Sequence, residues 1–407
     1  MRKACRRIGY VPNRFKTLMG LHLTIIAGET SGDLLGARLI TALKRQVPDV
    51  VFSGVGGTEM TKAGIQSVFP MDDISVMGLQ QILPRLKLIY RRIDETVESI
   101  IKSDTDAVIF IDSPEFAIRV AKRIRQVRPD LPMIKYGAPT VWGWRPGRAK
   151  AIKPYYNLIL ALLPFEPRVY QYLDGSECRY VGHPAVANLP TDKHVQGFKN
   201  KFSIAEGEQI LALLPGSRKG EVNRLSEPFI ETLSLLEENK QKLRVFIPAV
   251  PHIRDKIEQA LKKKEKSLEG FQITLIEGET DKLGLFGCAT AALAASGTVS
   301  LELALAGVPT VIGYDIDRVM AYFVIRVART PSVVMPNLIL DKPVIPEFLL
   351  HRCTPENLST ALQPLLNEAS EERTNQIEAF KTLKDIMTTE TDDPSSETAR
   401  HILDFLG

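Results

Sequence analysis

Apolar residues along the chain fall into short runs, and between the runs they recur every three or four positions. The runs in the first half cover 23–27, 51–55, 107–111, 133–136, 158–162 and 179–181. Most of these runs are apolar throughout, which is typical of strands that are buried on both faces of a parallel sheet. The stretch 31–45 between the first two runs has the spacing of an amphipathic helix.

A polar stretch from Asn188 to Asp192 separates this series from a second one and is interpreted as a linker. The second series has runs at 210–214, 244–247, 273–276, 291–294 and 310–313. Two successive series of strands and helices predict an α/β protein of two doubly wound, Rossmann-like domains. Such sheets bind ligands beyond the carboxyl ends of their strands, so two facing domains place an interdomain cleft between them.

We therefore divide the chain into four parts: a basic N-terminal extension (1–20), an N-terminal Rossmann-like domain (21–187), a C-terminal Rossmann-like domain (188–370) and a C-terminal helical segment (371–407). The segment 1–18 carries no acidic side chain, and its basic ones are Arg2, Lys3, Arg6, Arg7, Arg14 and Lys16. It lacks the apolar core of a secretory signal. Either the working chain begins near Met19, or this arm binds anionic lipid.

Composition narrows the function classes. No apolar run reaches the length of about 18 residues that a membrane-spanning helix needs. The net charge of +4 in 407 residues is too small to indicate a nucleic-acid partner. Four scattered cysteines form no C-x-x-C pair and the histidines show no H-x-x-x-H spacing. We therefore expect no metal, no cofactor and reduced thiols in the cytoplasm.

Two turns in the second half suit a bound phosphate. Ser296, Gly297 and Thr298 follow an expected strand and open a helix, whose free N–H groups and dipole favour an anion. Glu302 comes about one turn later, where it could accept hydrogen bonds from ribose hydroxyls. An ordinary helix start is the alternative.

The other turn contains Gly216, Ser217 and Arg218, directly after the run 210–214. A glycine frees the backbone, and an arginine offers a forked donor for phosphate. A solvated loop charge is the alternative here. Two such turns in one domain indicate a nucleotide site more strongly than either turn alone.

The first domain offers a carboxylate instead. Asp112 stands at the end of the expected strand 107–111, from where it could act as a general base towards a hydroxyl, or merely cap the next turn. The loop after the first strand lacks the G-x-G-x-x-G pattern of a dinucleotide site. We expect four of its residues to line the cleft: Glu29, Ser31, Gly32 and Asp33.

The segment 77–92 mixes leucines and isoleucines with four basic residues. Such a surface suits a membrane interface, although a helix packed on the core with a charged outer face fits as well. Pro84 should start a helix here or kink one. Met77 and Gly78, at its beginning, are assigned to the cleft as well, on the side where we expect a substrate that accepts a transferred group.

Nine motifs, in order from about residue 21 to the C-terminus, resemble the lipid-A-disaccharide synthase family. They are AGETSGD (27–33), VMGL (76–79), IDSPEF (111–116), PTVWGWR (139–145), LPFEP (163–167), VGHP (181–184), LLPGSRKGEV (213–222), ASGTVSLE (295–302) and MPNLI (335–339).

The resemblance implies a GT-B fold with the nucleotide held mainly by the second domain. It implies transfer of 2,3-diacylglucosamine from UDP to 2,3-diacylglucosamine 1-phosphate (lipid X), with inversion and without a metal. By the same resemblance Asp112 is the base, Arg218 and Asn337 are functionally sensitive, and Ser296, Gly297, Thr298 and Glu302 belong to the UDP site. We assign Asn337 to that UDP site too, together with Gly216, Ser217 and Arg218.

The family also implies a cytoplasmic protein that sits peripherally on the anionic inner face of the inner membrane. The oligomeric state stays open, with a homodimer as one candidate. Ala187 departs from the family pattern GHPxxD, in which an Asp stands three residues after the Pro. The competing enzyme is another GT-B protein, such as a UDP-N-acetylglucosamine transferase or 2-epimerase. A peripheral membrane protein that binds UDP-lipid or anionic lipid without turnover is the non-enzymatic alternative.

Overall fold

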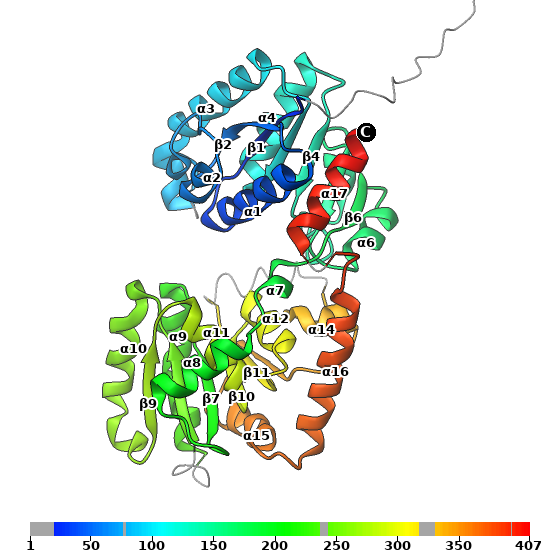
Figure 1. Cartoon of the computed structure of the whole chain (residues 1–407). Coiled ribbons are helices and arrows are strands. Elements are labelled where there is room, and N and C mark those ends of the chain that lie inside the picture. Colours follow the sequence, from blue (N-terminus) through cyan, green and yellow to red (C-terminus); the bar gives the residue numbers. More distant parts are fainter. Residues whose placement is uncertain (1–19, 76–78, 237–242, 317–329, 392) are drawn as a thin grey trace, which may run out of the picture.

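The computed structural model describes residues 20–75, 79–236, 243–316, 330–391 and 393–407, and it consists of two α/β domains (Figure 1). The first domain is built on a parallel sheet of six strands in the order β2-β1-β3-β4-β5-β6. Its strands are β1 (His22–Ile26), β2 (Val51–Val55), β3 (Ala107–Ile111), β4 (Met133–Tyr136), β5 (Leu158–Ala161) and β6 (Glu177–Tyr180). Its helices are α1 (Thr30–Gln46), α2 (Thr58–Lys62), α3 (Leu79–Lys102), α4 (Pro114–Val127), α5 (Gly147–Ile152), α6 (Glu166–Tyr172) and α7 (Pro184–Ala187).

The second domain repeats this architecture with a parallel sheet in the order β12-β11-β10-β7-β8-β9. Its strands are β7 (Gln209–Leu214), β8 (Leu243–Pro248), β9 (Gln272–Ile276), β10 (Ala291–Ala295), β11 (Thr310–Tyr314) and β12 (Glu347–Leu349). Its helices are α8 (Asp192–Phe202), α9 (Lys219–Ser234), α10 (Pro251–Lys263), α11 (Glu279–Cys288), α12 (Thr298–Leu305), α14 (Met335–Leu340), α15 (Pro355–Leu366) and α16 (Glu371–Met387), and the chain ends in α17 (Pro394–Leu406).

Each sheet is buried on both faces, as its uninterrupted apolar runs predict. In β3 every residue is buried, with Ala107, Ile109 and Ile111 in the core shared with α1. Val108 and Phe110 belong to the opposite core, shared with α3 and α4. This alternation follows from the two-residue period of a strand, and it places α1 and α4 on opposite faces of the sheet.

Helices on opposite faces after neighbouring strands create a crevice at the carboxyl ends of those strands. In the first sheet this switch point lies between β1 and β3, since α1 and α4 pack into different cores. In the second sheet it lies between β7 and β10, because α9 packs into one core and α12 into the other. Both loops that the sequence singled out for phosphate binding follow these last two strands.

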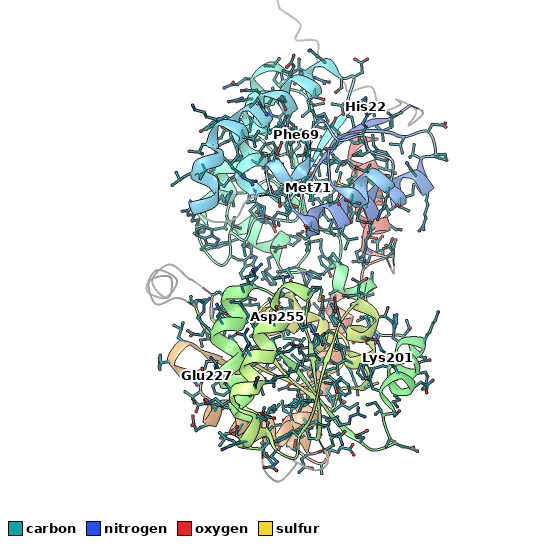
Figure 2. The ribbon with its side chains drawn as sticks, turned by 90° about the vertical axis from the view of Figure 1, so that its left-hand side faces the viewer. His22, Phe69, Met71, Lys201, Glu227 and Asp255 are labelled. Carbon is teal, nitrogen blue, oxygen red and sulfur yellow. The ribbon has the colours of Figure 1, made fainter. Side chains whose placement is uncertain are left out.

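The two switch points face each other across the boundary between the domains. Figure 2 shows His22, at the start of β1, on the side of the first domain that is remote from the second. The carboxyl ends of that parallel sheet therefore point towards the second domain. Asp255, near the start of the helix that follows β8, lies at the end of the second domain that faces the first.

The C-terminal helices divide between the domains. Phe380 and Leu383 of α16 belong to the core of the second domain, next to α12. The chain then returns, and α17 packs beside α1 with Ala399 and Ile402 in the core of the first domain (Figure 1). The C-terminal segment therefore packs on both domains of its own chain.

Most expected elements differ from the observed ones by only one or two residues at their ends. Pro84 does not start a helix, because α3 begins before it, at Leu79, and continues through it. A proline in the second turn of a helix removes few internal hydrogen bonds. The short strand β12 was not predicted. Within the described residues, no helix is both long and apolar enough to cross a bilayer.

Candidate active site

A cavity of about 460 Å³ opens at the carboxyl ends of β7, β8, β9 and β10 in the second domain. Seven of the eight residues predicted for the UDP site line it: Gly216, Ser217, Arg218, Ser296, Gly297, Thr298 and Glu302. Residues that are distant in sequence meet here because the parallel strands end at one edge of the sheet. Apolar side chains such as Val250 and Ile276 complete the wall.

The loop after β7 is folded around an anion. Gly216 has a φ of +114°. A Cβ atom at this position would lie 2.7 Å from the side chain of Glu221. The turn therefore requires glycine.

Glu221 is the anion that this loop binds. Its Oε2 accepts the backbone N–H groups of Ser217 and Arg218, both at 3.3 Å. Its Oε1 accepts a hydrogen bond from the Arg218 guanidinium at 3.0 Å. The donors of this loop therefore bind a carboxylate already, and the Arg218 side chain stays 71% exposed.

The turn after β10 leads into α12, whose N-terminus has no side-chain cap. Gly297 and Thr298 are exposed at this end, where the first N–H groups of a helix lack internal acceptors. Ser296 is turned away from this role, since its hydroxyl donates to the carbonyl of Val333 at 2.8 Å. The arrangement leaves a helix N-terminus open to the cavity, which favours an anionic ligand there.

Glu302 lies one turn into α12 and is held by a lysine of α11. Lys282 Nζ lies 3.1 Å from Glu302 Oε2 and 2.9 Å from Glu279 Oε1. Burial alone would lower the pKa of Lys282, but the Glu302 and Glu279 carboxylates raise it above its usual value. The lysine therefore stays charged, and it fixes the orientation of the Glu302 carboxylate in the wall of the cavity.

Asn337 does not line this cavity. It is almost fully buried in α14, where its amide donates to the carbonyl of Ile345 at 2.9 Å and accepts the N–H of the same residue at 2.8 Å. It also lies 3.5 Å from the hydroxyl of Ser332. These bonds fix the segment that contains Val333, the acceptor for Ser296. Asn337 is thus linked to the cavity only indirectly, through Val333 and Ser296, and a direct contact with UDP stays a prediction.

In the first domain, Asp112 lies directly after β3 on a strained turn. Asp112 has a φ of 49° and Ser113 has a φ of 36°. Residues other than glycine rarely adopt such values. Asp112 Oδ1 accepts the N–H of Gly28 at 2.9 Å. Its Oδ2 is packed against Gly32, where a Cβ atom would come within 1.6 Å of it. Among the described residues, this buried oxygen has no hydrogen-bond partner.

The surroundings of Asp112 shift its acidity. Burial raises the pKa of its carboxyl to about 6, and the charge of Glu29 acts in the same direction. The Gly28 N–H, the Lys135 ammonium and the Ser113 hydroxyl oppose this rise in pKa. The carboxylate is therefore mostly ionised at neutral pH but retains affinity for a proton, which suits a general base.

The other residues predicted to line the cleft do not lie together. Glu29 and Ser31 stand at the start of α1, partly or fully exposed. Asp33 is buried and accepts the N–H groups of Gly57, Glu59 and Met60 at 2.8 to 3.0 Å. These bonds cap α2. Met77 and Gly78 lie outside the described residues.

Sequence reasoning missed three charged residues at these sites. Lys282 and Glu221 line the cavity beside the predicted residues. Lys135 is buried in β4 and donates to the carbonyl of Asp112 at 2.6 Å. Lys135 had a visible signal, because a lysine within a run expected to be buried on both faces needs a partner. Within the described residues, no group of three or more metal-ligating side chains is present.

Known proteins resemble the chain over most of its length. A model of the family described as lipid-A-disaccharide synthetase matches residues 23–402. The lipid-A-disaccharide synthase of Nitrobacter hamburgensis is 42% identical over 386 residues, covering 94% of this chain and 95% of that protein. The one from Rhodospirillum centenum is 43% identical over 351 residues, covering 86% of each chain.

Solved structures resemble the chain at low identity. The S. aureus MnaA–UDP structure matches with a TM-score of 0.62 at 12% identity, over 95% of this chain and 97% of that one. The UDP-GlcNAc 2-epimerase of Methanocaldococcus jannaschii, in complex with UDP-GlcNAc and UDP, matches with a TM-score of 0.57 at 14% identity, over 95% and 100%. These likenesses, together with the two parallel sheets, show the GT-B fold.

Proposed function

The chain belongs to the lipid-A-disaccharide synthase family, and on that premise we propose which substrates it joins and how. As a member it is a glycosyltransferase of lipid A biosynthesis. The proposed donor is UDP-2,3-diacylglucosamine and the proposed acceptor is 2,3-diacylglucosamine 1-phosphate (lipid X). The products are the β-1,6-linked disaccharide 1-phosphate and UDP. The observation that carries this proposal is the pairing of an anion-binding cavity in one domain with a proton-accepting carboxylate in the facing domain.

UDP would occupy the cavity of the second domain. Its diphosphate would take the donors that Glu221 now satisfies, namely the Ser217 and Arg218 N–H groups and the Arg218 guanidinium. The open N-terminus of α12 offers a second set of donors. The Glu302 carboxylate, fixed by Lys282, is placed to accept hydrogen bonds from ribose hydroxyls. These groups stabilise the negative charge that develops on UDP as it leaves.

Asp112 would supply the base. Its carboxylate takes the proton of the acceptor 6-hydroxyl while that oxygen attacks the anomeric carbon of the donor. The bond between the anomeric carbon and the β-phosphate oxygen breaks, and UDP leaves with the electron pair. A single displacement of this kind inverts the configuration. Burial raises the pKa of this carboxyl to about 6. It is therefore mostly ionised at neutral pH, yet it binds a proton more strongly than an ordinary carboxylate does.

The acyl chains of both substrates require a lipid-facing surface, and α3 provides one. Leu83, Leu86 and Tyr90 are 63%, 39% and 48% exposed, and the basic side chains of Arg85 and Arg91 are exposed on the same helix. Apolar and basic residues on one exposed helix suit the anionic inner face of the inner membrane. We therefore place the enzyme there as a peripheral protein.

This placement has a direct test. Leu86→Asp should reduce co-sedimentation with phosphatidylglycerol-containing vesicles. Ile386→Asp, on an exposed apolar residue of α16 in the other domain, serves as the control. Equal binding of the two variants would show that α3 is not the lipid-facing element.

The reaction itself is tested with purified protein and both acylated substrates in detergent, in the presence of a chelator. Asp112→Asn should lower turnover by roughly 10²–10⁴-fold if the carboxylate is the base. Near-normal turnover in that variant would remove Asp112 from the role. Turnover of UDP-N-acetylglucosamine in place of the acylated donor would favour the transferase or epimerase alternative instead.

A further inference from the structure

One charged group of the first domain has no place in the steps described so far. Lys135 lies in β4 between Ile134 and Tyr136 and is 2% exposed. An ammonium group without water is strongly unfavourable unless charges and acceptors surround it. The location of Lys135 in the core of a parallel sheet therefore requires an explanation, because an apolar residue would fill the same space at a lower cost in desolvation free energy.

The hydrogen bonds of its ammonium group go to the end of β3. Lys135 Nζ donates to the backbone carbonyl of Asp112 at 2.6 Å and lies 3.5 Å from the carbonyl of Phe110. Phe110 and Lys135 are also paired in register across β3 and β4. The ammonium group thus reaches along the strand to the point where β3 ends.

That point is the strained turn. Asp112 and Ser113 both adopt left-handed φ values, and α4 begins immediately afterwards at Pro114. Two such residues in succession persist only where the surroundings fix them. The bond from Lys135 to the Asp112 carbonyl fixes the backbone at the residue whose side chain faces Gly28 and Gly32.

The charge of Lys135 acts on the same residue. Four charged groups from different elements influence one another electrostatically here: Asp112 after β3, Glu29 before α1, Arg148 on α5 and Lys135 itself. Burial lowers the pKa of Lys135 to about 8, Arg148 acts in the same direction, and Asp112 and Glu29 oppose this. Arg148 is partly neutralised by Glu115, at 3.1 Å. Lys135 therefore keeps its proton at neutral pH.

We propose that Lys135 is a positioning residue for the transfer reaction, holding the Asp112 turn through the Asp112 carbonyl and keeping the Asp112 carboxylate ionised by its charge. This inference rests on the proposed role of Asp112 as the base. It assigns to Lys135 no contact with either substrate.

The test is the pH dependence of kcat/KM for the acceptor, measured with saturating donor. In Lys135→Met the acid limb of this pH profile should move to higher pH, because the Asp112 carboxyl loses the Lys135 charge that favours its ionised form. A shift of one pH unit means roughly a tenfold loss at a pH below both limbs. Lys135→Gln also lacks the charge and should show the same shift. It keeps a donor for the carbonyl, so its activity on the alkaline plateau should exceed that of Lys135→Met.

Controls separate this effect from general loosening. Ile134→Val changes a buried neighbour on the same strand and should leave the acid limb at the wild-type pH. UDP binding, measured by calorimetry, reports on the second domain and should be unchanged in all three variants, as should cooperative thermal unfolding. If only one of the variants Lys135→Met and Lys135→Gln folds well, that variant still reports the pH of the acid limb.

Two outcomes would overturn the inference, and they are distinguishable. If Asp112→Asn is folded and inactive while both Lys135 variants retain the wild-type limb, Asp112 stays the base and Lys135 loses its role. If Asp112→Asn turns over like the wild type, the proposed base is wrong, and the role of Lys135 falls with it.

Discussion

Gly32 makes the position of the Asp112 carboxylate testable without changing that carboxylate. The glycine lies in the first turn of α1, buried, with Asp112 Oδ2 directly beside it. Gly32→Ala would place a Cβ atom 1.6 Å from Oδ2, where ordinary contact begins at 3.4 Å. The carboxylate and the helix must therefore separate by the difference between these distances, roughly 1.8 Å.

This displacement sets the expected loss of activity. A misplacement of about 1 Å in a reacting group can cost roughly 10²-fold in rate. We therefore expect Gly32→Ala to lower kcat by at least about 10²-fold, close to the effect of Asp112→Asn. Stability should respond differently, because alanine in a helix is favoured over glycine by at most about 1 kcal/mol and offsets part of the strain.

Gly36→Ala is the matched control on the same helix. Its Cβ atom would meet the side chain of Met60, with the sulfur at 2.5 Å. This introduces a clash of similar kind in the core, but a methionine side chain can move where a turn-bound carboxylate cannot. Both variants are assayed with the acylated substrates and by thermal unfolding. A kcat of Gly32→Ala within threefold of the Gly36→Ala value would refute the argument that this oxygen is fixed by Gly32.

The remaining predictions concern a phosphate donor and a buried acid. Arg218→Ala should weaken UDP binding by roughly 10–100-fold, since a charged hydrogen bond contributes about 1.5–3 kcal/mol, while its exposed pair with Glu221 adds little stability. Arg254→Ala, which removes an exposed ion pair of the same domain, is the calorimetric control, and equal affinities for UDP would exclude Arg218 from the site. Glu166 is the buried acid: burial raises the pKa of its carboxyl from 4.5 to about 7, opposed by hydrogen bonds from Trp142 and the Leu163 N–H. Since the folded pKa is the higher one, ionisation of Glu166 removes stability as the pH rises from 4.5 to 7, by at most about 3 kcal/mol. The Tm of Glu166→Gln should therefore rise relative to the Tm of the wild type as the pH increases from 5 to 8. A constant difference between the two Tm values across that range would contradict the raised pKa of Glu166.

The fold followed from the sequence because its main signal is strong. A strand such as β3, apolar at every position, has few alternatives to a buried parallel sheet, and its observed bounds match the expected ones. The weaker signals were harder to interpret. The strand β12 has only three half-buried residues and depends on pairing with β11, which no local pattern reveals. The return of α17 to the first domain is likewise set by packing against α1.

At the site, sequence identified loops better than it identified roles. The turns at Gly216 and Ser296 were expected together, and parallel topology brings both to one cavity. Asp33 was expected to line the cleft, yet it caps α2. The sequence pattern could not distinguish these two roles, because a carboxylate in such a loop can serve either. Lys135 could not be linked to Asp112 from sequence, since their contact depends on the register of β3 against β4.

The two halves of the proposed site differ in how far their side chains are enclosed, and the proposed reaction needs that difference. Asp112 is enclosed by two glycines and tied through its own carbonyl to a buried lysine, so its position and its affinity for a proton are set before a substrate arrives. Arg218 is mostly exposed and bonded to a carboxylate that a diphosphate can replace. A base must be held in place to take a proton at the moment of attack, whereas a product that leaves after each cycle must be released. With the proposed base fixed in one domain and the proposed phosphate donors exposed in the other, both requirements are met within one chain.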